Sequence, residues 1–423
     1  MKYYIIIFLL SIMLAGCSQN TESGKEDNIT NTATTKETEQ PNKEENKQET
    51  PMPVTKLDIE NYSLEYKEDT DTQSFFPKYN ITKSEKGYYL WGGGDYAYYL
   101  MFFDAKTQKT VLLCNLPNCT HSQTDNTCNA FFSPGAEKDV IWDSGVWYYE
   151  NYVYMLGCDE EDYVSIYRIK PDGSSREKYM RLYRADTTPS ENDGSKQYRI
   201  PDLIIHRGYV YYVDSKEKNP KLRRIKLGGT ETEILYETNG VFKKEGDKAD
   251  LIFVRAYGDY VFFMRSSVFM KEQRELTGLY AYNIQTGEIT FVSNSIESDY
   301  TIYKNEIYYS GEKDLRKFSI QTQKDEKIMD CPEGITAVSV DSDTITILST
   351  KDNRIHIYDK GLNVLYEDKK YEVDQENEEI GVLFFYKGDE NFLFASFYGE
   401  QNRMRILDKS KLKDKTAKWE LMY

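Results

Sequence analysis

A short tyrosine-rich phrase recurs along most of the chain and limits the folds open to it. Each copy begins at a Gly, Asn, Asp or Glu turn, continues into a run in which Tyr, Phe or β-branched residues alternate, and reaches a partner run after a polar gap. The seven copies lie at 87–91, 151–155, 208–212, 259–263, 305–309, 343–347 and 390–394. Six partner runs lie at 165–169, 221–225, 278–282, 314–318, 354–358 and 403–407.

Alternation with a period of two, bounded by turn residues, predicts β-strands. The copies begin about 40 to 65 residues apart, and a repeat of that length with about four strands is typical of propeller blades. We therefore predict an all-β chain that folds as a single β-propeller of seven four-stranded blades. Six or eight blades remain open, and a stacked β-solenoid is the alternative. The long interval between Tyr88 and Tyr152 predicts an insertion after the first blade.

The 37 tyrosines are expected mainly to pack one blade against the next, because aromatic side chains at alternating strand positions fill the space between sheets. Tyrosines at blade tips or near a central channel could instead contact a ligand. The sequence does not identify which ones these are.

The phrase at 208–212, Gly-Tyr-Val-Tyr-Tyr, and the partner run Leu279-Tyr280-Ala281-Tyr282 with its Thr286-Gly287 turn carry a resemblance. They resemble the β-propeller domain similar to that of low-density-lipoprotein-receptor-related proteins, which occurs in many lipoproteins of anaerobic Gram-positive bacteria. The resemblance covers roughly residues 80 to 410. It implies the propeller fold and a place in the cell envelope, and it implies no catalytic activity.

The N-terminus predicts export. Lys2 precedes an apolar run, Tyr3 to Met13, that is too short for a permanent membrane span, and Leu14-Ala15-Gly16-Cys17 follows it. This tetrad resembles a bacterial lipobox, which implies cleavage before Cys17 and lipidation of Cys17 with diacylglycerol and palmitate. The lipid would hold the protein on the outer face of the cytoplasmic membrane, facing the cell wall or exterior. An ordinary secretory signal, with Cys17 incidental, is the alternative.

We predict that the chain consists of three segments. Residues 1–17 are predicted to form the lipoprotein signal peptide and lipobox. Residues 18–56 are almost entirely polar and are predicted to be a disordered linker, because they cannot bury enough apolar surface to offset their ordering entropy. Residues 57–423 are predicted to form the propeller domain.

The net charge of −16 and the pI near 4.9 disfavour binding to nucleic acid and to anionic lipid headgroups. Cations, cationic peptides and neutral glycans are easier partners for such a surface. We therefore expect an extracellular glycan, peptide or protein as partner, and the membrane only through the lipid on Cys17.

A cysteine and histidine cluster lies in the predicted insertion, residues 113–135. The cluster consists of Cys114, Cys119, His121 and Cys128, with the spacing C-x4-C-x-H-x6-C. Three thiolates and one imidazole suit Zn²⁺ or another borderline-soft ion. Four protein ligands would form a closed structural site, so one structural zinc ion is the only cofactor that we expect. The ending Cys128-Asn129-Ala130 also resembles a recurrent loop of the lipoproteins named above.

Disulfides are the alternative for these cysteines, since an exported protein favours them. Cys158 and Cys331 are then possible partners. Five cysteines remain once Cys17 is lipidated, so they cannot all pair within one chain.

The sequence indicates no catalytic residue. It lacks the G-x-S-x-G, H-E-x-x-H, Walker and dinucleotide-binding motifs. His206 and His356 are expected to be packed or exposed strand residues rather than general bases. The acidic run 159–162 is expected to be a solvated loop, with a Ca²⁺ site as the alternative.

These observations favour a non-catalytic binding or scaffolding module, anchored at the cell envelope. One alternative is a carbohydrate-active lyase or hydrolase, whose paired carboxylates would converge only in the folded channel. Another is an accessory or sensor subunit of an envelope complex. The ligand-binding residues cannot be assigned from the sequence.

Overall fold

A computed structural model describes much of the chain from residue 55 onward. The described residues are 55–67, 70–71, 80–92, 99–121, 127–131, 145–159, 161–184, 202–214, 219–238, 248–268, 276–331, 334–351, 353–368, 371–372, 379–380, 382–397 and 404–422. The chain divides into two units, residues 1–47 and 48–423, and the described residues all belong to the second. The predicted signal peptide, Cys17 and residues 18–54 of the predicted linker lie outside them.

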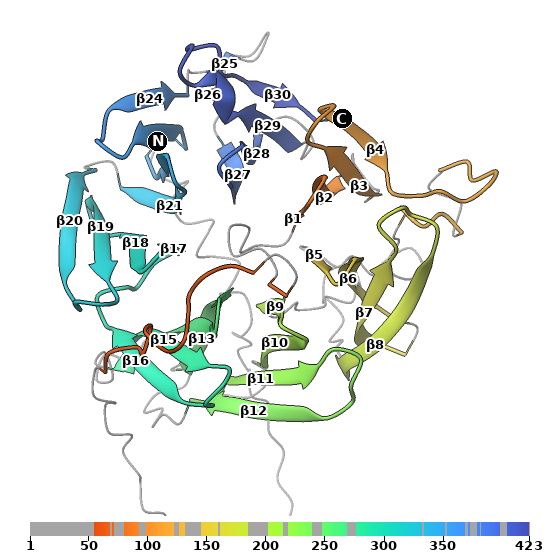
Figure 1. The fold of residues 1–423 in the computed structure, drawn as a ribbon, viewed down its shortest axis with the longest axis horizontal. Coiled ribbons are helices and arrows are strands. Elements are labelled where there is room, and N and C mark those ends of the chain that lie inside the picture. Colours follow the sequence, from red (N-terminus) through yellow and green to blue (C-terminus); the bar gives the residue numbers. More distant parts are fainter. Residues whose placement is uncertain are drawn as a thin grey trace, which may run out of the picture. The chain divides into compact units, whose positions relative to one another are not determined.

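Within the described ranges, seven four-stranded antiparallel sheets form the blades of a β-propeller (Figure 1). Blade 1 consists of β1 (Ile81–Ser84), β2 (Gly87–Gly92), β3 (Tyr99–Asp104) and β4 (Lys109–Leu112). Blade 2 consists of β5 (Val146–Tyr149), β6 (Tyr152–Cys158), β7 (Tyr163–Ile169) and β8 (Arg176–Arg184). Blade 3 consists of β9 (Leu203–His206), β10 (Tyr209–Asp214), β11 (Lys221–Lys226) and β12 (Thr232–Glu237).

The remaining four blades follow in chain order. Blade 4 consists of β13 (Lys248–Tyr257), β14 (Tyr260–Val268), β15 (Gly278–Asn283) and β16 (Ile289–Ser293). Blade 5 consists of β17 (Tyr300–Tyr303), β18 (Glu306–Ser310), β19 (Asp314–Ser319) and β20 (Asp325–Asp330). Blade 6 consists of β21 (Ile335–Val340), β22 (Thr344–Ser349), β23 (Ile355–Asp359) and β24 (Val364–Glu367). Blade 7 consists of β27 (Val382–Gly388), β28 (Phe392–Phe397), β29 (Met404–Asp408) and β30 (Trp419–Leu421).

Two small elements accompany the blades. A two-stranded sheet, β25 (Tyr371–Glu372) and β26 (Glu379–Ile380), lies between blades 6 and 7 in the sequence, and the 3-10 helix η2 (Lys409–Lys411) follows β29. Among the residues described, no helix has the length and apolar character needed to cross a membrane.

The structure confirms the predicted fold class and the number of blades, and it excludes the solenoid. The seven tyrosine-rich runs form the second strand of each blade, and the partner runs form the third. The first strand of each blade lies nearest the centre of the ring in Figure 1. The repeat did not reveal these first strands, because several of them, such as β9 with its four consecutive buried residues, lack alternation.

Seven apolar clusters hold the ring together, and each joins two neighbouring blades. Tyrosines contribute much of this packing, as predicted. The rings of Tyr89 in blade 1 and Tyr148 in blade 2 stack with centroids 5.5 Å apart, and those of Tyr183 and Tyr212 stack at 5.9 Å between blades 2 and 3. Such pairs contribute about 0.5–1.5 kcal/mol each beyond the apolar area that they bury.

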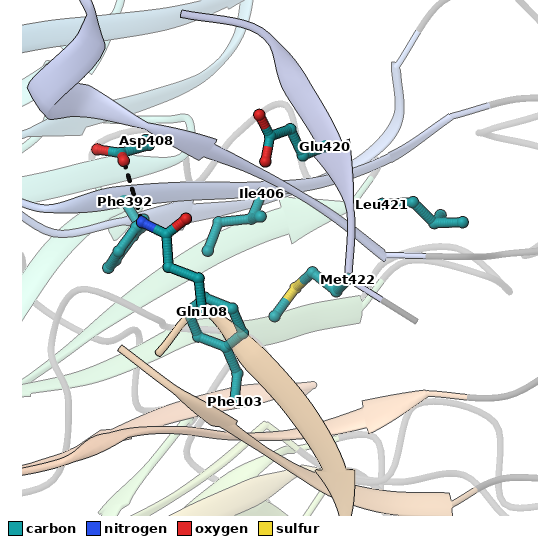
Figure 2. A pocket seen from close by; sticks show the side chains of 8 residues that line it. All are labelled: Phe103, Gln108, Phe392, Ile406, Asp408, Glu420, Leu421 and Met422. Carbon is teal, nitrogen blue, oxygen red and sulfur yellow. Dashed lines mark hydrogen bonds between the residues drawn. The ribbon is translucent and has the colours of Figure 1, made fainter. Parts of the chain in front are cut away.

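Blades 7 and 1 are not consecutive in the chain, and side-chain contacts join them where the ring closes. The hydroxyl of Tyr88 donates a 2.7 Å hydrogen bond to the Asp389 carboxylate, which is fully buried and lies 3.0 Å from Lys83 Nζ. Figure 2 shows the outer side of this junction, where Gln108 Nε2 donates a 3.2 Å hydrogen bond to Asp408. A small pocket of about 40 Å³ remains there between the two blades.

The first strands of three blades are linked by a buried ion network. Asp299, directly before β17, pairs with Arg255 of β13 and lies 2.8 Å from Lys387 Nζ of β27. Burial alone would raise the pKa of Asp299, but the two cations lower it to about 2. Asp341 of blade 6 and Lys409 of blade 7 form a second buried pair. The acidic groups in these two clusters are therefore neutralised by cations inside the ring.

Residues 55–67 form a strap that packs against blade 4. Leu57 and Leu64 are buried in the cluster between blades 4 and 5. Ser63 exchanges hydrogen bonds with Asp259 in the β13–β14 turn, at 2.8 Å from the Ser63 N–H to the carboxylate and 2.7 Å from the Asp259 N–H to the Ser63 carbonyl. The strap therefore belongs to the folded domain, and it covers the blade 4 turn.

We predict that Phe394→Ala lowers the free energy of unfolding by about 3–5 kcal/mol, because Phe394 is fully buried between blades 7 and 1 and its loss leaves a cavity. Val364→Ala is the control, since Val364 is 54% exposed and its change should cost less than about 0.5 kcal/mol. Urea denaturation measures both. Equal, small losses would show that the blade 7 to blade 1 contact does not limit stability.

Candidate metal centre

The loop between β4 and β5 brings the four predicted ligands together. The Sγ atoms of Cys114, Cys119 and Cys128 and a ring nitrogen of His121 all lie within 4.8 Å of one another. Cys128 Sγ is 3.5 Å from His121 Nδ1. A tetrahedral zinc ion with Zn–S bonds of about 2.3 Å requires ligand atoms about 3.8 Å apart, so small side-chain adjustments would complete such a site. The cluster could hold a metal ion.

The backbone between the first two cysteines turns tightly and supplies hydrogen bonds to sulfur. The N–H of Cys119 donates to the Leu116 carbonyl at 3.3 Å, and Asn118 adopts a φ of 62°. The N–H groups of Leu116 and Asn129 donate to the Cys114 sulfur. Such hydrogen bonds orient thiolate ligands and disperse their charge.

The thiols differ in acidity. Burial alone would raise the pKa of Cys114, but the two N–H groups and the neighbouring thiols bring it below its ordinary value. Burial is also the largest influence on Cys119 and, together with the Cys128 and Cys114 thiols, raises its pKa to about 12. The Cys114 sulfur is thus favoured as a thiolate before the Cys119 sulfur.

The end of the loop is fixed to blade 1. The N–H of Leu100 in β3 donates a 2.8 Å hydrogen bond to the Ala130 carbonyl, and Tyr99 forms an isolated bridge with Phe131. Cys128, Ala130 and Phe131 form a small buried cluster of their own. Their burial holds Cys128, which is fully buried, beside the other ligands.

Blade 2 supports the same loop through one carbonyl. The Gly173 carbonyl, in the β7–β8 turn, accepts hydrogen bonds from the Asn115 N–H at 3.0 Å and from Asn129 Nδ2 at 2.9 Å. Gly173 has a φ of 72°, and a Cβ at this position would lie 2.7 Å from the Cys114 nitrogen. Only glycine fits this approach between the two segments.

Spacing in the sequence identified the four ligands because they lie within 15 residues of one another. It did not identify Gly173, which is far away in the sequence and is brought to the loop by the packing of blade 2. The only local sign was the Pro171-Asp172-Gly173 run, a turn signal that says nothing about a contact with Cys114.

The structure describes several of the cysteines that the disulfide alternative would pair. Cys114, Cys128 and Cys331 have free thiols, and Cys331 lies in the cluster between blades 5 and 6, away from the loop. The side chain of Cys158 and residues 122–126 and 132–135 of the predicted insertion lie outside the described part of the chain.

The other candidate residues have structural contacts. His206 is fully buried, with Nε2 2.7 Å from the Gly258 carbonyl oxygen, and His356 is partly exposed, with Nδ1 3.7 Å from Glu367. The prediction of a solvated acidic loop is wrong for Asp159, which is 6% exposed, accepts the Tyr163 N–H at 3.0 Å and pairs with Arg181 at 2.6 Å. Its role is to fix the β6–β7 turn.

Comparisons with known proteins add little beyond the fold. No family model matches the sequence, and neither does any curated protein. Among solved structures, a prolyl endopeptidase is similar with a TM-score of 0.48 and 11% identity, over 84% of this chain and 50% of that one. The chain therefore spans about half the length of that enzyme.

Two other similar structures are shorter. An oligogalacturonate lyase from Vibrio parahaemolyticus has a TM-score of 0.46 and 8% identity, over 78% of this chain and 88% of that one. A chain of a nidogen/laminin complex has a TM-score of 0.36 and 11% identity, over 66% of this chain and 92% of that one. Likenesses at this level carry no argument about function.

We predict that Gly173→Ala lowers the free energy of unfolding by about 2–4 kcal/mol, because it adds a steric clash with Cys114 to the strain of a left-handed residue. Gly287→Ala is the matched control. Gly287 has a φ of 77° but open space around it, so the change should cost only about 1 kcal/mol. Urea denaturation of both variants measures the difference, and equal losses would contradict the proposed contact between blade 2 and the loop.

Proposed function

We propose that the chain is a non-catalytic binding or scaffolding module, held at the outer surface of a bacterial cell by a lipid on Cys17. The observation that best supports a non-catalytic role is the buried ion network of the inner strands. Asp299 is paired with Arg255 and Lys387, and its low pKa leaves it ionised and unable to donate a proton. The network stabilises the ring rather than presenting a reactive carboxylate.

The carbohydrate-active enzyme considered above would need two carboxylates with different protonation states near a sugar ring. Two buried acidic groups, Asp341 and Asp389, are paired with Lys409 and Lys83. A third, Asp368, accepts hydrogen bonds from the Ile355 N–H and from Trp419 Nε1. This engagement favours a structural role for them. The binding function is therefore the better supported of the two.

We further propose that the metal of the cysteine loop is a structural zinc ion. Three sulfurs and one imidazole are a ligand set that zinc favours, and a set of four leaves no open position for a substrate. The ion would hold together the loop after blade 1, which Asn115 and Asn129 connect by hydrogen bonds to the Gly173 carbonyl of blade 2. Its contribution would be to stability, since metal bound only by the folded state stabilises that state.

We predict one zinc ion per chain in protein purified without reducing agent, and its loss in Cys114→Ser and Cys119→Ser. Cys331→Ser is the control, because Cys331 is buried elsewhere and should not affect zinc content. Metal analysis and thiol counting before and after chelation measure this. Unchanged zinc in the loop variants, or a disulfide mapped within the loop, would contradict the proposal.

We predict that a palmitate analogue labels the full-length protein expressed in a Gram-positive host, and that the label disappears in Cys17→Ser. Cys331→Ser should keep the label. Fractionation of the cells tests the location, since the wild-type protein should remain with the membrane and be degraded by protease added to cells without a wall. Labelling that survives Cys17→Ser would refute lipidation at this residue.

A further inference from the structure

A polar pocket of about 450 Å³ lies where blades 5 and 6 meet, and nothing described above uses it. It is formed by the β17–β18 and β19–β20 turns of blade 5 and by the turns that follow β21 and β23 in blade 6. Its lining consists of tyrosine, lysine, amide, hydroxyl and carboxylate side chains: Tyr303, Lys304, Asn305, Glu306, Tyr308, Ser319, Gln321, Ser342 and Lys360. Its volume is within the range of small-molecule sites, about 300–1,000 Å³.

Two lysines from different blades approach the same tyrosine ring in this pocket. Lys360 Nζ lies 4.6 Å from the centroid of the Tyr303 ring, and Lys304 Nζ lies 5.4 Å from it. The Lys360 ammonium is also 5.6 Å from the Tyr308 ring. Two ammonium groups near one ring repel each other, and an anion bound beside them would offset that repulsion.

Other cations that lie over tyrosine rings in this propeller have a carboxylate partner. Arg168, 4.0 Å from the Tyr179 ring centroid, pairs with Glu177, and Arg224, 4.8 Å from the Tyr209 centroid, pairs with Glu233. Within the described residues, no carboxylate forms such a pair with Lys304 or Lys360. The pocket thus has the cations and the aromatic ring of this arrangement, but the anion must come from elsewhere.

Two acidic groups that influence Lys360 are already paired with other lysines. Glu306 lies 2.8 Å from Lys317 Nζ and accepts a 2.8 Å hydrogen bond from the Tyr308 hydroxyl. Asp341, which also influences Lys360, is paired with Lys409. Of the three charged side chains that line the pocket, two are lysines, and the third, Glu306, is already paired with Lys317.

The remaining lining groups suit a hydroxyl-rich ligand. Asn305, Gln321, Ser319 and Ser342 offer both donors and acceptors, and the nine lining residues include no aliphatic side chain. An apolar peptide side chain would find little to contact here. A sugar ring could pack on Tyr303 and exchange hydrogen bonds with the amides and hydroxyls, while a carboxylate on the sugar would meet the two lysines.

We infer that the pocket between blades 5 and 6 binds a carboxylated sugar, the uronic-acid unit of an acidic glycan. This inference rests on the proposed role of the propeller as a binding module, and it gives that module a ligand class. It depends neither on the zinc ion nor on the lipid.

The test is calorimetric titration of the purified protein with trimers of galacturonic, glucuronic and mannuronic acid, with their methyl esters, and with inorganic phosphate. We expect at least one uronate trimer to bind, its ester to bind at least tenfold more weakly, and salt to weaken the binding. Lys304→Gly and Lys360→Met should each reduce affinity about tenfold or more, because each removes one charge-assisted contact.

The variants are chosen to preserve the fold. Lys304 has a φ of 56°, so glycine fits its backbone better than lysine does, and methionine keeps the unbranched stem of Lys360. Lys413→Met, at an exposed lysine of blade 7, is the matched control and should bind like the wild type. Thermal unfolding of each variant confirms that it is folded.

Each other outcome has a distinct meaning. Equal binding of acid and ester, binding of phosphate alone, affinity unaffected by both lysine variants, or no binding of any trimer at millimolar concentration would each overturn the inference. In those cases the measurements of zinc content and of lipidation would still test the other two proposals independently. Cleavage of a bound trimer, followed by chromatography, would instead refute the non-catalytic function while leaving the ligand class intact.

Discussion

The contact between the last blade and the first is the constraint on which the whole ring depends. Every other pair of neighbouring blades is consecutive in the chain, whereas blades 7 and 1 are the last and the first, and side-chain contacts join them. The buried Asp389 carboxylate accepts a hydrogen bond from the Tyr88 hydroxyl and forms an ion pair with Lys83. Phe394 packs in the same apolar cluster as Tyr88. A buried carboxylate without these partners would cost several kcal/mol, so the junction requires them to be in place together.

Polar contacts of the same kind recur toward the centre. Asp299 draws together residues of blades 4 and 7 at the start of blade 5, so side chains from blades far apart in the sequence meet inside the ring. Apolar packing between neighbours fixes each blade against the next, and the buried ion pairs fix their relative register. The loops and turns at the surface can then vary while the ring persists, which is how propellers support unrelated functions.

The predictable part of this structure is local. Tyrosines at every second position in the runs at 208–212 and 278–282 revealed β10 and β15, although most or all residues of these strands are buried. The strand β9, Leu203-Ile204-Ile205-His206, escaped notice because its residue types do not alternate. The cysteine cluster was found through its short spacing, but Gly173 was not, since its contact with Cys114 depends on how two blades pack. Lys304 and Lys360 are likewise neighbours only in the folded ring.

The continuity of each blade has an evolutionary consequence. In a ring whose last blade borrows a strand from the other end of the chain, gaining or losing a blade would disturb the shared sheet. Here β1–β4 and β27–β30 are complete sheets. An in-frame duplication or deletion of one repeat would therefore change the ring by a whole unit and leave no orphan strand. The free-energy cost would come from the changed curvature of the ring and from the side chains at one new junction between blades. Point mutations could later improve the packing of that junction.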